Sequence, residues 1–223
     1  MFTIIRNAFQ HKRNGSHAGQ SVRSTIYAPD RIGLVGFHDR GFVIARPAES
    51  HSPWLQQRIQ QVHTRIAGDG TNITDGLRTA VGLLSGAPSG VLRRIWLLSD
   101  GYPNLEESRI NEVLQQARQA YINVNTIGFG HSYDQSLLRG IASQTHNGRF
   151  VPVADLQQLT EALVAAGGGR DRHQNQRSHR SEITIVAVDL SVSMREPMGS
   201  RTKIEVVEQA LLQLLLYKQR CFS

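Results

Sequence analysis

The sequence EITIVAVDLSVSM, residues 182–194, decides the fold that we expect for this chain. Five of its first seven residues are apolar, mostly Val and Ile, which is typical of a strand buried on both faces. The sequence Asp189-Leu190-Ser191-Val192-Ser193 follows at once. The pattern predicts a buried strand over residues 182–188 whose carboxyl end carries oxygen-bearing side chains.

Apolar residues at helical spacing follow this loop. They are Ile204, Val207, Leu211, Leu214 and Leu215. Because this spacing places them on one face, we expect a helix that covers a sheet. The C-terminal part of the chain is therefore a strand, a loop and a helix.

The rest of the chain alternates strand and helix patterns. Strands are expected over residues 31–37, 42–45, 94–98, 123–129 and 148–153, and helices over residues 54–66, 77–84, 110–121, 137–141 and 156–165. The first two strands are separated by a turn, and the last of these five is expected at an edge. This alternation predicts a Rossmann-like, doubly wound α/β fold, with a mainly parallel central sheet and helices on both faces.

Composition divides the chain into four parts. Residues 1–29 and 167–181 are basic and rich in Gly, Ser, Asn and Gln, so they are expected to be a flexible tail and a flexible linker. Residues 30–166 form the main part of the predicted domain. Residues 182–223 carry the strand, loop and helix described above.

The length and composition fit one ordinary domain of 223 residues and 24.8 kDa. Its apolar runs are too short to cross a bilayer, and its start lacks the pattern of a signal peptide. Cys221 is the only cysteine, so no intrachain disulfide can form. We expect a cytoplasmic protein with no membrane partner.

Three loops carry side chains that suit a hard cation. One is the Asp189, Ser191, Ser193 loop, and the others contain Thr71, before a predicted helix, and Asp100, after a predicted strand. Mg²⁺ prefers oxygen ligands and keeps some of its water. Each loop alone is also typical of a helix cap or a turn, but their joint appearance favours a cation site.

The sequences VAVDLSVSM, TKIEVVEQAL, GTNITDGL and LLSDGYPN resemble the metal-ion-dependent adhesion site of von Willebrand factor A domains. The resemblance extends over about residues 30–165 and 183–217, and includes TIGFG and FVPVADLQQLTEAL. It implies that Asp189, Ser191, Ser193, Thr71 and Asp100 hold Mg²⁺ or Mn²⁺ directly or through water. A partner's Glu or Asp would complete the coordination.

The order of the elements differs from that family, which begins with the D-x-S-x-S strand and its helix. Here these elements come last, so the chain looks circularly permuted. Alternatively, residues 182–223 begin a second, truncated copy, or they complete the sheet of another chain. The expected state is therefore a monomer or a segment-swapped dimer.

The resemblance implies a non-enzymatic module that binds an acidic side chain of a partner protein through the cation. Bacterial members often work beside ATPase chaperones, which makes such a chaperone one possible partner. A haloacid-dehalogenase-like phosphatase with Asp189 as nucleophile is the alternative, but its pattern needs a second Asp where this chain has Ser191. The net charge of +7 would suit nucleic acid, yet no recognition motif accompanies it, so no specific nucleic acid is expected.

Overall fold

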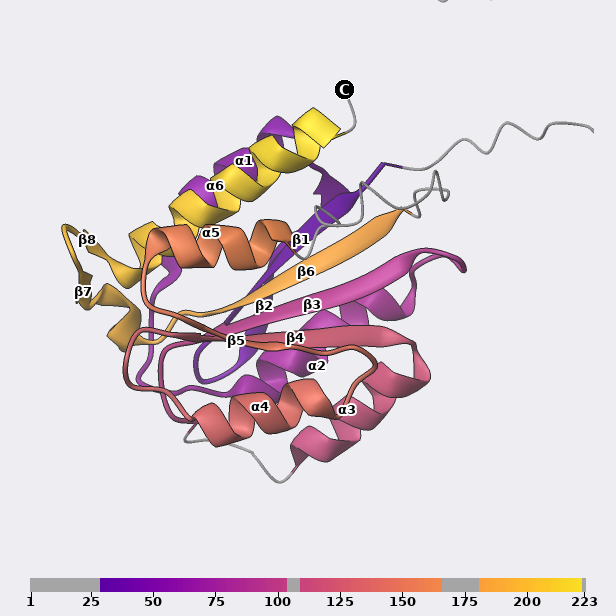
Figure 1. The fold of residues 1–223 in the computed structure, drawn as a ribbon, viewed down its shortest axis with the longest axis horizontal. Helices are drawn as coiled ribbons and strands as arrows, with labels where there is room; N and C mark the ends of the chain where they lie inside the picture. The colour runs from indigo at the N-terminus through magenta and orange to yellow at the C-terminus, as the bar shows by residue number, and fades with distance from the viewer. Residues whose placement is uncertain (1–28, 104–108, 166–180, 222–223) are drawn as a thin grey trace, which may run out of the picture.

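A computed structural model describes residues 29–103, 109–165 and 181–221 of the chain. The predicted flexible tail and linker lie almost entirely outside these residues. The described part forms one central sheet with helices packed against it (Figure 1).

Within the described ranges, six strands form the sheet in the order β2-β1-β6-β3-β4-β5. Their bounds are β1 Arg31–Phe37, β2 Gly41–Glu49, β3 Leu92–Ser99, β4 Ile122–Phe129, β5 Phe150–Val153 and β6 Glu182–Asp189. All neighbours are parallel except the β1–β2 hairpin at one edge. The structure thus confirms the predicted, mainly parallel sheet, and it places β5 at the other edge as expected.

The last long strand of the chain, β6, lies in the middle of this sheet. It pairs in parallel with β1 on one side and β3 on the other, with Asp189 opposite Phe37 and Val188 opposite Leu98. Every residue of β6 is buried, which explains its nearly continuous apolar sequence. Because these three strands are parallel, their carboxyl ends lie at the same edge of the sheet.

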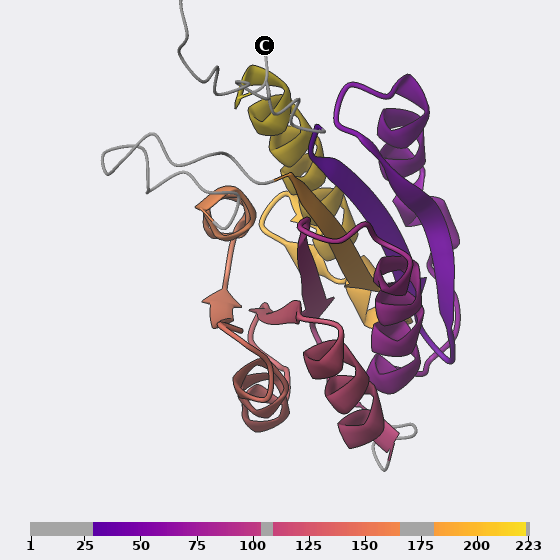
Figure 2. The ribbon, with the colours of Figure 1, turned by 90° about the vertical axis from the view of Figure 1, so that its right-hand side faces the viewer.

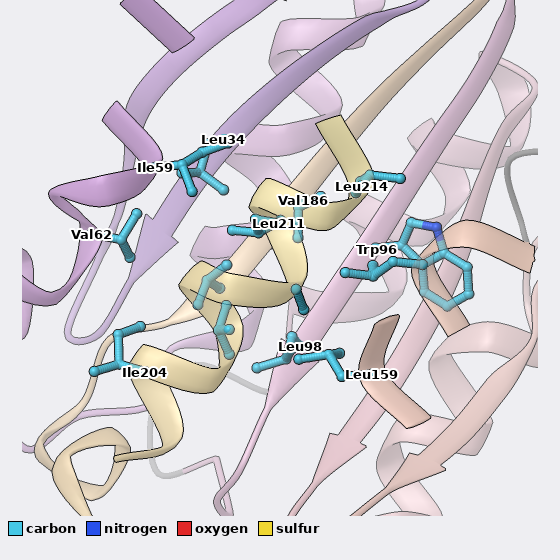
Figure 3. Packing of buried hydrophobic residues seen from close by; sticks show 14 of the residues in the cluster. Leu34, Ile59, Val62, Trp96, Leu98, Leu159, Val186, Ile204, Leu211 and Leu214 are labelled. Carbon is cyan, nitrogen blue, oxygen red and sulfur yellow. The ribbon is translucent and has the colours of Figure 1, made fainter. Parts of the chain in front are cut away.

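Helices cover both faces of the sheet, as predicted (Figures 1 and 2). One face packs against α1 Pro53–Gln60, α5 Leu156–Ala165 and α6 Lys203–Cys221, and the other against α2 Ile73–Ser85, α3 Ile110–Gln119 and α4 Gln135–Ser143. Alternate residues of β6 pack into the hydrophobic clusters on opposite faces of the sheet. Val186 packs with Leu211 and Leu214 of α6 (Figure 3), whereas Ile185 joins the opposite cluster.

The prediction of one continuous helix over residues 54–66 is wrong. The α-helix ends at Gln60, and a 3-10 turn, Val62–Arg65, follows. The Gln61 N–H donates to the Arg58 carbonyl, and the backbone N–H of His63 donates to Glu208 Oε1 of α6 at 2.8 Å. That N–H is therefore not given to the carbonyl of Ile59, as a continuing α-helix would require.

A buried charged network fastens the C-terminal part to the start of β1. The Lys218 ammonium of α6 contacts Asp30 Oδ2 at 2.5 Å and Glu182 Oε1 at 3.7 Å. The other oxygen of Asp30 accepts from the Glu182 N–H at 2.9 Å. Since unpaired buried charges are costly, this arrangement favours one register of β6 beside β1.

None of the helices in the described ranges combines the length and the apolar character needed to cross a membrane.

Candidate metal centre

Asp189 is the last residue of β6, and it is fully buried. Its Oδ1 accepts from the Ser191 N–H at 3.0 Å, and its Oδ2 accepts from the Ser99 hydroxyl at 2.9 Å. Burial raises the pKa of Asp189 to about 6; the nearby Asp100 charge adds to this, and the hydrogen bonds from Ser191 oppose it.

Within the described residues, no basic side chain forms an ion pair with Asp189. A carboxylate buried in this way is costly in its charged form unless a cation lies near it. Asp189 is therefore chemically suited to a bound cation or, without one, to a proton.

The loop after β6 brings two hydroxyls together. Ser191 has an extended backbone, and the 3-10 turn Val192–Arg195 follows it. The hydroxyls of Ser191 and Ser193 are 2.9 Å apart, and Ser193 Oγ donates to Asp100 Oδ1 at 2.8 Å. The loop is anchored by buried Leu190, whose N–H donates to the Phe37 carbonyl at 2.7 Å. The C-terminal loop thus directly contacts the end of β3.

Asp100 follows β3 and, unlike Asp189, has a basic partner. Its Oδ2 accepts from Lys203 Nζ, the first residue of α6, at 2.6 Å. The same ammonium donates to Glu196 Oε2 at 2.6 Å. Burial lowers the pKa of Lys203, but the bonds to both carboxylates outweigh it, so this pKa is raised. Lys203 is charged and compensates Asp100.

Thr71 comes from the loop before α2. The Ala67 N–H donates to the Leu190 carbonyl at 3.1 Å, and the Asn72 N–H donates to the His38 carbonyl at 2.7 Å, so both ends of this loop are held. Thr71 also lies close to Gly101, which follows Asp100: a Cβ atom added to this glycine would lie 3.7 Å from Thr71 Oγ1. The helix-capping role belongs to Asn72, whose Oδ1 accepts from the Asp75 N–H.

A hollow of about 240 Å³ is lined by the hydroxyl residues of the two loops. Its lining is Asp69, Thr71, Gly101, Tyr102, Ser191, Val192 and Ser193. All three predicted hydroxyl residues therefore line one space, whereas Asp100 and Asp189 do not line it. The two carboxylates are joined to the lining by hydrogen bonds from Ser193 to Asp100 and from Ser191 to Asp189. Tyr102 and Val192, which are 64% and 43% exposed, form an apolar rim.

The sequence interpretation missed three contributors. Asp69 lines the hollow two residues before Thr71, and its signal was a carboxylate within the same Gly-Asp-Gly-Thr loop. Ser99 holds Asp189, and it directly precedes Asp100 in sequence. The sequence did not indicate Lys203, because a basic residue at the start of a helix has no expected role in a cation site.

The donor set fits a hard divalent cation. It offers two carboxylates and three hydroxyls, which suit Mg²⁺ or Mn²⁺ rather than a metal that prefers sulfur or imidazole. The described residues contain no cluster of three His, Cys, Asp or Glu side chains able to hold a metal. A cation here would therefore depend on hydroxyl and water oxygens as well as on carboxylates.

The family model of the von Willebrand factor type A domain matches residues 23–165, more than half of the chain. The chain belongs to this family. Von Willebrand factor A domains generally mediate protein–protein interactions without catalysis, and they commonly bind a divalent metal ion. The matched region contains Thr71 and Asp100, whereas Asp189, Ser191 and Ser193 lie after it.

Two further likenesses are distant. An uncharacterized protein of Borreliella burgdorferi is 25% identical over 140 residues, which are 62% of this chain and 40% of that protein. The chain thus matches less than half of this relative's length. The crystal structure of an uncharacterized membrane spanning protein from Vibrio fischeri matches with 24% identity and a TM-score of 0.30, covering 64% of this chain and 77% of that one.

Proposed function

We propose that this chain is a divalent-cation-dependent protein-binding module. Asp189, Ser191, Ser193, Thr71 and Asp100 hold Mg²⁺ or Mn²⁺, directly or through water, and the ion captures a Glu or Asp side chain of a partner protein. The observation that carries the proposal is the buried carboxylate of Asp189, which lacks a basic partner among the described residues and accepts a hydrogen bond from Ser191, one of the three hydroxyl residues that line the hollow.

The chemistry of the donor set supports capture of a further ligand. Mg²⁺ and Mn²⁺ take about six oxygen ligands, and protein sites for them usually retain water. A water ligand can be exchanged for a partner's carboxylate. The hydroxyl residues line an open hollow, which leaves a route for that carboxylate.

The rim supports a protein as the partner. Tyr102 and Val192 are exposed beside the hydroxyls, and an aromatic side chain next to a polar centre is typical of the residues that contribute most to protein interfaces. By analogy with bacterial family members, we propose an ATPase chaperone as the partner, and we place the module in the cytoplasm.

We further propose that the C-terminal part completes the domain in cis, as a circular permutation. The position of β6 between β1 and β3 of the same chain supports this, as does the buried Lys218–Asp30 pair. A segment-swapped dimer would use the same contacts between two chains. Light scattering distinguishes the two, since a swapped dimer has twice the mass.

We assign no catalytic role to Asp189. A phosphatase nucleophile must reach its substrate, whereas this side chain is fully buried and both of its oxygens accept hydrogen bonds. The position two residues later is Ser191, which cannot perform the acid–base work of a second aspartate.

A peptide-binding assay tests the proposal. Fluorescence anisotropy would measure binding of a labelled Gly-Glu-Gly peptide in Mg²⁺ or Mn²⁺, with Gly-Gln-Gly as the uncharged match. We expect binding of the Glu peptide alone, its loss in EDTA, and its loss in Asp189→Ala but not in the control Glu112→Ala, which changes an exposed residue of α3. Equal binding of both peptides, or binding that survives EDTA, would contradict the proposal.

A further inference from the structure

The two buried carboxylates of the site are in opposite electrostatic situations. Asp100 is paired with Lys203 at 2.6 Å, and both side chains are almost fully buried. Asp189 accepts only hydrogen bonds from Ser191 and Ser99 among the described residues. Of these two buried carboxylates, only Asp100 is therefore paired with a fixed positive charge.

The ammonium of Lys203 is firmly held. It lies between buried Asp100 and the Glu196 carboxylate, which is 62% exposed, at 2.6 Å from each. The backbone N–H of Lys203 also donates to the Glu196 carbonyl at 3.0 Å. The buried pair with Asp100 is the stronger of the two, because solvent screens the exposed Glu196 carboxylate, and it keeps the ammonium at the site.

This fixed charge has opposite consequences for the two ligands of the proposed site. A positive charge beside Asp100 repels a divalent cation and so weakens its binding. For the same reason, it leaves a bound cation less neutralised by the protein, and a less neutralised ion attracts an anionic carboxylate more strongly. Asp69 also lines the hollow, but it is exposed, so water and salt screen its charge.

We propose that Lys203 is the residue that sets the ligand preference of this site: it lowers affinity for the cation and raises affinity for the partner's carboxylate. The inference rests on the proposed function, because both ligands belong to that site. It assigns to Lys203 a role that neither the ligand pattern nor the family match provides. If Lys203 only stabilised the structure of the site, its replacement would weaken the binding of the cation and of the carboxylate alike.

The test compares Lys203→Met, which removes the charge, with Lys203→Arg, which keeps it. Calorimetry of the full metal-free chain would measure Mn²⁺ binding, and anisotropy at saturating Mn²⁺ would measure the Gly-Glu-Gly peptide. We expect the Met variant to bind Mn²⁺ about tenfold more tightly and the peptide about tenfold more weakly. The Arg variant should stay within about threefold of wild type in both.

A second variant keeps the test decisive if Lys203→Met does not fold. Glu196 is exposed, and Glu196→Gln removes a negative charge next to the ammonium. The local potential becomes more positive, so the shifts reverse: Mn²⁺ binding should weaken and peptide binding should strengthen, each by about threefold. Opposite changes of the two affinities in the two variants would show that the charge at this position causes them.

The outcomes separate this inference from the proposed function. If wild type binds Mn²⁺ and peptide, but the variants change both affinities in the same direction or change neither, only the role of Lys203 is overturned. If wild type binds no Mn²⁺, or binds Mn²⁺ but no peptide, the proposed function fails and the inference fails with it.

Discussion

Replacing Asp189 with Asn isolates the charge at the centre of the site. Asn has the same shape, its Oδ1 can accept from the Ser191 N–H, and its amide can donate to the Ser99 hydroxyl. The substitution therefore removes the ionisable group and leaves the two hydrogen bonds possible. We expect the metal-free Asn variant to be more stable than wild type at neutral pH.

The sign and size follow from the pKa of Asp189. It is about 6 in the folded protein and near its ordinary value of 3.8 in the unfolded chain. The stabilisation from the protonated group is complete below pH 3.8 and is lost as the pH rises through about 6. A shift of roughly two units corresponds to about 3 kcal/mol at pH 7, which is the gain expected for Asn.

Urea unfolding followed by circular dichroism measures this difference. In EDTA, the Asn variant should exceed wild type by about 3 kcal/mol at pH 7 and by only about 1 kcal/mol at pH 4.5. Saturating Mg²⁺ should stabilise wild type and not the variant. An Asn variant less stable than wild type at pH 7, or a difference independent of pH, would refute the view of Asp189 as an uncompensated buried charge.

Three further predictions concern neighbouring groups. Below pH 6, protons should compete with Mg²⁺ for Asp189 and lower the affinity for Mg²⁺ by up to about tenfold per pH unit. Calorimetry at pH 5 and pH 7 measures this affinity, and equal values would show that Asp189 is not a ligand. Tyr102→Ala should weaken the binding of the partner by about 2 kcal/mol and leave the affinity for Mg²⁺ unchanged. The control is Tyr121→Ala, which also changes an exposed tyrosine. Equal effects of the two substitutions would show that the rim has no specific role in binding the partner. Asp30→Ala should lower the free energy of unfolding by about 3 to 5 kcal/mol, because it leaves the Lys218 ammonium buried without its closest partner; a loss below 1 kcal/mol would show that the network is unimportant.

Most of the fold could be predicted because local sequence and tertiary burial agree. The sequence of β6 is apolar on both of its faces, and the structure places the strand where both faces are covered. The prediction of one helix over residues 54–66 failed in its second half, where the His63 N–H donates to Glu208, a side chain 145 residues away in sequence. Periodicity within a window contains no information about such a contact.

The site, like the fold, could be predicted only in part. The loops that carry Asp189, Thr71 and Asp100 end or begin regular elements, and the parallel arrangement of strands brings them to one edge. The sequence therefore indicates which residues meet. It does not indicate that Lys203 reaches Asp100, because a long side chain's direction depends on how α6 lies over the sheet. Charge compensation within the site could be found only from the structure.

Calorimetric titration of the metal-free chain of residues 1–223 with Mg²⁺ and Mn²⁺, combined with light scattering, tests the central claim most directly. We predict saturable binding of one ion per monomer in wild type and none in Asp189→Ala. Absence of saturable binding in wild type, or undiminished binding in Asp189→Ala, would contradict a cation site built on this residue.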